Sequence, residues 1–361
     1  MSKRVLMLTG IYWNETYQRH QQFAEYLAKA GYKVDFVEHI VSSKFNFNVL
    51  IKRLLYRGNT ANSKENSRDK NIKCISSKFV FPGSGVFKLY NKWAAKKLLI
   101  DLEDTYDIVI NYLPLYTTRY IIEKVRYKKL IYDCVRNFEG WGRYYGDLID
   151  EEAKLIKIAD KIFTDSYFLT DNMAVKAPEK VVQFLPIANN KWLAGCIHKK
   201  TPEQIKDIAY FGTFSYHIDV AILSLLASNR FKIHIWGELA EHPNFEYIYH
   251  GYENDLTKLA TDIIDNTDAI IIPYQGVMDG VIPAKMIQCL SSGLPVFISS
   301  FYDSNKLREY QYVYKNGEQL LNMISSYSPV EYKQKQEKIN QYIKCLTEGD
   351  QYHKFISEIE S

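Results

Sequence analysis

The chain has 361 residues, of which 47% are hydrophobic and 24% are charged, and its formal net charge is +4. This ordinary globular mixture excludes a mainly disordered or fibrous protein, and the length favours two domains. No apolar run approaches the ~18–20 residues of a membrane span, and we expect no signal peptide. The five cysteines are scattered without a CxxC pair, which predicts reduced thiols in a cytosolic protein.

Strand and helix patterns alternate through the first half of the chain. A strand is expected over residues 4–9, a helix over residues 19–30 that stops at Gly31, and a strand over residues 33–38. Such a βαβ opening predicts a parallel sheet. The pattern continues with a helix at residues 150–159 and strands at 108–111, 130–132, 161–164 and 181–185. The first half is therefore predicted to be a doubly wound α/β domain.

The basic residues concentrate in one part of this half. Residues 42–100 contain 13 lysines and arginines and two acids, a local net charge of +11 that leaves −7 for the rest. This indicates an anionic partner, although a solvated loop has the same composition. Residues 45–57 and 86–99 mix basic with apolar and aromatic side chains, which favours membrane-surface helices over a nucleic-acid site. The alternative is that both apolar faces pack into the core.

A polar stretch at residues 188–207 precedes a second alternating pattern. It comprises strands at 208–211, 232–236, 269–272 and 296–299 and helices at 220–228, 255–265 and 284–291. We therefore expect an N-terminal domain over residues 1–190, a C-terminal domain over 205–328, and a helical tail over 329–361 that packs back on the first domain. Two such domains would place a cleft between the carboxyl ends of two sheets, where ligands bind and helix N-termini favour phosphate.

The most informative stretch follows the expected strand at residues 269–272. A glycine-bearing loop leads to Pro283, which pre-sets the start of a helix. Lys285 then occupies the first turn, where the helix dipole disfavours a cation unless an anion shares the site. Gln288 lies three residues on, on the same helix face. An ordinary βαβ unit with a surface lysine is the competing interpretation.

These residues carry a family resemblance. The string P-x-K-x-x-Q-x-L-x-x-G-x-P-V, from Pro283 to Val296, is similar to the donor-site helix of GT-B glycosyltransferases. Further stretches resemble the family's glycine turn, strand ends, opening helix and a bacterial polysaccharide-assembly subset: residues 210–219, 236–237, 250–253, 18–34, 132–135 and 152–166. The resemblance implies a GT-B fold, that is, two Rossmann-like doubly wound parallel-sheet domains facing a central cleft.

The resemblance also implies an activity and its site. The chain would move a sugar from a nucleotide sugar, a UDP-sugar, to a glycan or lipid-linked oligosaccharide in bacterial surface polysaccharide synthesis. It would work in the cytoplasm, peripherally on the inner face of the cell membrane. The resemblance assigns the donor diphosphate or a donor carboxylate to Lys285 and the nucleotide to Gln288. The remaining donor-site residues are Gly212, Thr213, Phe214, Tyr274 and Glu253.

One departure from the family pattern concerns the mechanism. Many retaining members carry Glu-x7-Glu, whereas the two positions here are Gly280 and Gln288. The combination Lys-x-x-Gln instead resembles the inverting glucuronosyltransferase of xanthan assembly. An inverting transfer needs one general base, which the resemblance places near Asp133, with His20 as the second candidate. A capping role for Asp133, a solvated His20, a surface role for Glu253 and a retaining mechanism all stay open.

Other functions find less support. The chain has no HxxxH, no Cys/His cluster and no DxD at a strand end, so we expect no metal and no further cofactor. The diphosphate charge would be met by Lys285, the helix dipole and backbone N–H groups. The loop at residues 9–14 has one glycine, which argues against an NAD enzyme. A non-catalytic sugar-nucleotide-binding subunit remains open because both acids are missing.

Overall fold

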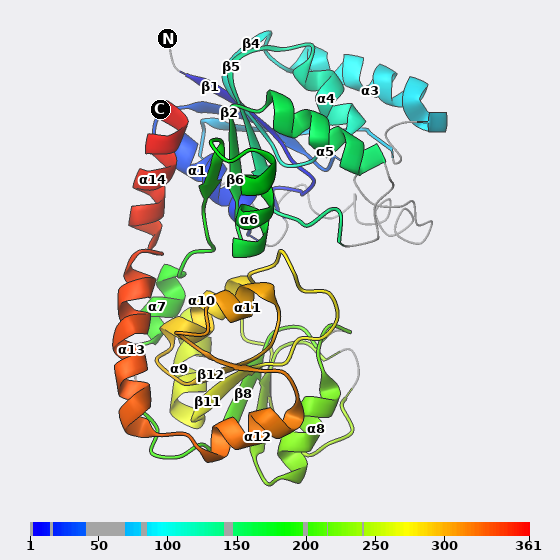
Figure 1. Ribbon diagram of the computed structural model, residues 1–361. Helices are drawn as coiled ribbons and strands as arrows, with labels where there is room; N and C mark the ends of the chain where they lie inside the picture. The colour runs from blue at the N-terminus through cyan, green and yellow to red at the C-terminus, as the bar shows by residue number, and fades with distance from the viewer. Residues whose placement is uncertain are drawn as a thin grey trace. The chain divides into compact units, whose positions relative to one another are not determined.

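In the computed structural model, the chain folds into two compact units (Figure 1). Unit 1 comprises Met1–Asp165, Leu169–Phe184 and Tyr352–Ser361, and unit 2 comprises Ser166–Phe168 and Leu185–Gln351. The structure describes residues 3–14, 17–40, 69–80, 85–140, 147–197, 201–214, 216–239 and 242–361. The basic stretch at residues 45–57, expected to be a membrane-surface helix, lies outside these ranges.

Unit 1 is built on a parallel sheet in the order β3-β2-β1-β4-β5-β6-β7. The strands are β1 (Arg4–Leu8), β2 (Lys33–Glu38), β3 (Ile72–Ser76), β4 (Thr105–Asn111), β5 (Arg126–Cys134), β6 (Lys161–Thr164) and β7 (Val181–Gln183). The central strand β1 is buried on both faces, since residues from Val5 to Leu8 are fully shielded. Such continuous apolar runs are typical of parallel strands covered by helices.

Helices cover this sheet in two groups. They are η2 (Gly85–Phe87), α1 (Arg19–Lys29), α3 (Lys88–Asp101), α4 (Tyr116–Ile122), α5 (Asp147–Ile158), α6 (Tyr167–Lys176) and α14 (Glu348–Glu360). Figure 1 shows α3, α4 and α5 in succession, and α1 beside the C-terminal helix α14. The latter pair is joined by Phe23 and Phe355, whose ring centroids are 4.1 Å apart. The crossover connections bring the helix entries to the carboxyl edge of the sheet.

Unit 2 repeats the architecture with six parallel strands in the order β10-β9-β8-β11-β12-β13. The strands are β8 (Asp207–Phe211), β9 (Lys232–Trp236), β10 (Ile248–Gly251), β11 (Ala269–Ile272), β12 (Val296–Ser299) and β13 (Tyr312–Tyr314). The helices are α7 (Asn190–Gly195), α8 (Val220–Ser228), α9 (Leu256–Asn266), α10 (Ala284–Ser291), α11 (Tyr302–Lys306), α12 (Gly317–Ser325) and α13 (Pro329–Lys344). The prediction of two doubly wound α/β domains is confirmed.

The C-terminal tail is divided between the units. Helix α13 belongs to unit 2, where Tyr332, Ile339 and Ile343 join the buried core. The last turns of α14 belong to unit 1, where Lys161 pairs with Glu358 at 2.6 Å. The tail was expected to pack back on the first domain, and Tyr352–Ser361 are grouped with unit 1. No helix among the described residues combines the length and hydrophobicity needed to cross a bilayer.

Candidate functional site

The amine of Lys285 lies at the carboxyl edge of the unit 2 sheet. Its Nζ donates a hydrogen bond to the carbonyl oxygen of Phe211, the last residue of β8, at 3.2 Å. The rings of Tyr210 and Tyr274 flank the same amine, with centroids 4.5 and 4.9 Å from Nζ. Tyr274 follows β11, and β8 and β11 are neighbours at the point where the strand order reverses. Open α/β sheets bind ligands at this switch point.

The surroundings of the Lys285 amine, among the described residues, contain no paired carboxylate. Burial lowers the pKa of Lys285 to about 8. Among the described residues no aspartate or glutamate pairs with its amine, and its partners are a carbonyl oxygen and aromatic faces. Lys285 also lies in the first turn of α10, where the helix dipole is unfavourable to a cation. An anion bound beside Lys285 and the N–H groups of α10 would offset both costs.

A glycine turn faces this amine. Gly212 has φ +114°, and a Cβ added to it would lie 3.5 Å from Lys285 Nζ. Gly237, with φ +136°, is equally restricted, because its Cβ would come within 2.3 Å of the Gly212 carbonyl oxygen. Both positions need the conformational freedom of glycine. A side chain at position 212 would therefore extend into the space beside Lys285 and the Tyr210 hydroxyl.

The remaining residues of the turn contact Tyr210. The Tyr210 hydroxyl donates to the carbonyl oxygen of Thr213 at 2.9 Å, and the Phe214 ring meets the Tyr210 ring edge-on at 5.5 Å. The structure thus brings together five of the expected donor-site residues: Gly212, Thr213, Phe214, Tyr274 and Lys285. Tyr210, which contacts Lys285, Thr213 and Phe214, was not among the expected site residues because a tyrosine inside a buried strand looks like ordinary core.

Two expected donor-site residues have other surroundings. Gln288 lies on α10, partly buried, one turn beyond Lys285. Glu253 precedes α9 and pairs with Lys258 at 2.6 Å, and its other oxygen accepts from the Asp255 N–H at 2.9 Å. The hydrogen bond from Lys258 is the main cause that holds the pKa of Glu253 below its ordinary value, and the bond from the Asp255 N–H acts in the same direction. Glu253 therefore helps to form the start of α9, and an incoming ribose would compete with Lys258 for it.

In unit 1, Asp133 lies near the end of β5 and is fully buried. Both of its carboxylate oxygens accept from Arg19, with the Nε atom 2.9 and 3.1 Å away. A second guanidinium nitrogen of Arg19 donates to the Phe184 carbonyl oxygen at 2.6 Å. Arg19 thus covers the carboxylate of Asp133. A bidentate pair of this kind holds both side chains in one orientation.

His20 lies next to this ion pair. It is 7% exposed, its ring packs against Tyr112 at 4.1 Å, and its Nδ1 atom has no hydrogen-bond partner within the described ranges of the chain. Burial, together with the charges of Arg136 and Arg19, lowers the pKa of His20 to about 3. The imidazole is therefore neutral at physiological pH. Tyr112 follows β4, which adjoins β1 at the switch point of this sheet, so the cluster occupies the ligand-binding edge.

Arg19 was missed by the sequence analysis, although a signal was present. It is the first residue of α1, an unfavourable position for a cation. The same argument singled out Lys285 and applies equally to Arg19. The partner of Arg19 is 114 positions away, and no local pattern identifies it.

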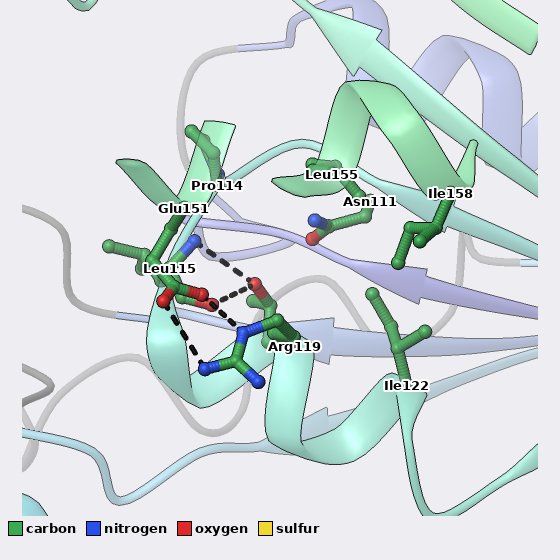
Figure 2. A pocket seen from close by; sticks show the side chains of 9 residues that line it. Asn111, Pro114, Leu115, Arg119, Ile122, Glu151, Leu155 and Ile158 are labelled. Atoms are coloured by element: carbon green, nitrogen blue, oxygen red, sulfur yellow. Dashed lines mark hydrogen bonds and ion pairs between the residues drawn. The ribbon is translucent and has the colours of Figure 1, made fainter. Parts of the chain in front are cut away.

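Figure 2 shows a recess in unit 1 between α4 and α5. Its lining is mainly apolar: Asn111, Pro114, Leu115, Thr118, Arg119, Ile122, Glu151, Leu155 and Ile158. Arg119, its cation, is bound by both Glu151 and Glu123. The recess therefore has no free charge for a ligand. The described residues contain no group of three or more His, Cys, Asp or Glu side chains arranged to hold a metal ion.

Comparison with known proteins shows the fold. The chain matches sucrose-phosphate synthase from Thermosynechococcus elongatus with a TM-score of 0.67 at 12% identity, over 99% of this chain and 98% of that one. The trehalose-6-phosphate protein from E. coli, bound with UDP-2-fluoro glucose, gives 0.65 at 9% identity over 99% of both chains. Anabaena HepE in complex with UDP gives 0.62 at 10% identity over 100% of both chains.

These neighbours are GT-B glycosyltransferases, and the expected GT-B fold is confirmed. No protein-family model matches the sequence, and no curated protein matches it significantly.

Proposed function

We propose that the chain is a glycosyltransferase that takes its sugar from a nucleotide sugar, a UDP-sugar. The observation that carries this proposal is the amine of Lys285, a cation without a carboxylate partner among the described residues, facing a glycine turn at a sheet switch point. The GT-B fold supports it, since structures of this fold hold UDP or a UDP-sugar analogue. Fold likeness alone would leave the activity undecided.

The donor site has one main task in such a transfer. As the bond between the sugar and the diphosphate breaks, its electron pair leaves with the nucleoside diphosphate, which gains negative charge. Lys285 and the N–H groups at the start of α10 would stabilise that charge. The aromatic rings around Lys285 exclude water, which strengthens its interaction with an anion.

For the acceptor side we propose inversion with Asp133 as the base. The acceptor hydroxyl would lose its proton to the base while its oxygen forms the new bond to the sugar carbon. Asp133 is held by Arg19, so the acceptor must share the carboxylate with Arg19 or displace it. His20, whose Nδ1 has no partner in the part of the chain that the structure describes, is the alternative base at the same sheet edge. A retaining mechanism would need neither.

We further propose that the acceptor is a glycan or lipid-linked oligosaccharide of bacterial surface polysaccharide synthesis, used at the cytoplasmic face of the membrane. The resemblance of residues 132–135 and 152–166 to polysaccharide-assembly enzymes supports this acceptor. The +11 charge of residues 42–100 supports a location beside anionic lipid. No nucleic-acid partner is proposed.

Turnover separates the enzyme from a binding subunit of the same fold. A panel of UDP-, GDP- and TDP-sugars is incubated with the protein and a lipid-linked sugar acceptor, and release of the free nucleotide is followed. We expect release from at least one UDP-sugar and little without acceptor. Binding of a nucleotide sugar with no release from any donor would instead support the non-catalytic subunit.

Donor binding should depend on pH through Lys285. Its pKa of about 8 means that the amine is charged below pH 8 and loses its proton above it. Anion binding favours the charged form, so affinity for UDP should be constant near pH 7 and fall by up to about tenfold per unit well above pH 8. Calorimetric titrations from pH 6.5 to 9.5 measure this slope. Lys285→Arg, which stays charged, should show a flat profile, and an equal slope in both proteins would contradict the prediction.

The transfer should also proceed without a divalent metal. Lys285 and the helix α10 N–H groups would supply the positive charge that a metal gives other transferases. Adding EDTA to the nucleotide-release reaction should leave the initial rate within about twofold. A loss that Mg²⁺ or Mn²⁺ restores would show that a metal carries part of the diphosphate charge.

A further inference from the structure

Helix α3 has an unusual distribution of side chains. The residues that it buries against unit 1 are small or medium in size: Asn91, Ala94, Ala95 and Leu98. Its bulky side chains face solvent instead, with Leu89 82%, Ile100 81% and Trp93 47% exposed. A surface helix normally buries its large apolar residues and exposes its polar ones. The exposed apolar face of α3 is therefore unexplained by the packing of unit 1.

These exposed residues form one stripe. Leu89, Trp93 and Ile100 stand at helical spacing of four and then seven residues, so they share the outer face of α3. Tyr90 and Phe87, 42% and 40% exposed, extend the stripe at its N-terminal end. We call this set the α3 stripe. An aromatic and aliphatic surface of this kind marks an interaction site.

Lysines border the α3 stripe. Lys88, Lys92, Lys96 and Lys97 lie on the same helix, and no acid interrupts the sequence from Lys88 to Ile100. Within the part of the chain that the structure describes, none of these lysines forms an ion pair. The Lys88 amine lies over the Tyr116 ring of α4, 5.3 Å from its centroid, so Lys92, Lys96 and Lys97 are the ones whose charge is available to a partner. Lys97 lies over the Trp93 ring, 4.1 Å from its centroid, with its stem along the apolar stripe. Lysines that cover apolar surface while keeping their amines in water are typical of membrane interfaces.

We infer that the outer face of α3 binds the surface of an anionic lipid bilayer. The apolar stripe enters the boundary between head groups and acyl chains, and Lys92, Lys96 and Lys97 contact lipid phosphates. The combination of Trp, Tyr and Leu with unpaired lysines favours lipid over a protein partner, whose surface would need matching acids. It favours lipid over nucleic acid because phosphate contacts alone would leave the apolar stripe in water. This deepens the proposed function by assigning the acceptor membrane to unit 1.

Vesicle flotation tests the inference with the full chain. The vesicles are phosphatidylcholine, either pure or with about one third phosphatidylglycerol. The wild-type protein should float with the anionic vesicles, should float less with neutral ones, and should bind less in about 0.5 M than in about 0.1 M salt. Two variants test the charged and the apolar side chains separately. Lys92→Gln/Lys96→Gln/Lys97→Gln removes the charge, and Trp93→Ser/Ile100→Ser removes two large apolar residues of the α3 stripe. Each should lower the floated fraction by about tenfold or more.

A matched control removes the same charge elsewhere. Lys206, Lys315 and Lys333 are exposed lysines of unit 2, and changing all three to Gln should leave flotation unchanged. UDP binding, measured in parallel, reports on folding and on the proposed function independently of lipid. Flotation that fails in a protein that binds UDP overturns the membrane inference alone.

Three results would overturn the inference. Equal flotation of wild type and both α3 variants would place the lipid site elsewhere. Binding to a short DNA duplex without flotation would make the lysines a nucleic-acid site. Self-association that Trp93→Ser/Ile100→Ser abolishes, again without flotation, would make the α3 stripe an interface between two copies of the chain.

Discussion

Replacing Asp133 with Asn is expected to lower turnover by about 10²–10⁴-fold while affinity for the nucleotide sugar stays unchanged. Asparagine keeps the size and the acceptor oxygen of the side chain but cannot take a proton from the acceptor hydroxyl at neutral pH. The donor site lies in the other unit, around Lys285, so binding of UDP should not depend on this change. Steady-state nucleotide release and calorimetry measure the two quantities.

The ion pair with Arg19 complicates this variant. Removing one partner of a buried pair leaves an uncompensated charge and can cost about 3–5 kcal/mol of stability. The double variant Arg19→Gln/Asp133→Asn removes both charges and should recover stability, as measured by thermal unfolding. If Asp133 is the base, the double variant stays inactive. If Asp133 serves only as the counter-ion of Arg19, the double variant regains much of the activity.

The variant His20→Gln tests the second candidate for the catalytic base. Because His20 is buried and neutral, glutamine can replace much of its volume and hydrogen-bonding capacity. A fall of less than tenfold for Asp133→Asn together with a large fall for His20→Gln would move the base to His20. Small effects in both would favour a retaining mechanism, which the anomeric configuration of the product tests independently.

Replacing Lys285 with Ala should weaken UDP-sugar binding by about 1.5–3 kcal/mol, the usual range for a hydrogen bond to a charged group. The change removes the cation that faces the Gly212 turn and leaves Tyr210 and Tyr274 in place. Lys315→Ala, an exposed lysine of the same unit, is the matched control and should bind as the wild type does. Equal affinity of Lys285→Ala and wild type by calorimetry would remove Lys285 from the donor site.

Much of the fold could be predicted because its strands have local signals. Residues 269–272 are apolar throughout, and residues 232–236 alternate isoleucines with Lys232 and His234 before Trp236; both strands were placed at their observed limits. The edge strands β3 and β13 were missed. Strand β13 has three residues, and β3 lies in the basic stretch 42–100 and mixes buried with exposed residues; each pairs with a single neighbouring strand. Such tertiary pairing leaves no local periodicity.

The candidate site was predictable where chemistry conflicts with local structure. Lys285 could be singled out because a cation in a first helical turn is unfavourable without an anion. The aromatic rings around Lys285 could not be predicted, because Tyr210 and Tyr274 come from two different strand ends that meet only in the folded sheet. The Asp133–Arg19 pair joins residues 114 positions apart. Sequence spacing could place Asp133 near a strand end, and it carried no information on what would cover the carboxylate.

The most direct test of the account is the mass and configuration of a reaction product. Wild-type protein, a UDP-sugar and a lipid-linked acceptor are incubated, and the acceptor is examined by mass spectrometry and NMR. We predict that the acceptor gains the mass of one sugar with inverted anomeric configuration, and that Lys285→Ala reduces the yield. Release of UDP and free sugar without any gain in acceptor mass would contradict the proposed glycosyl transfer.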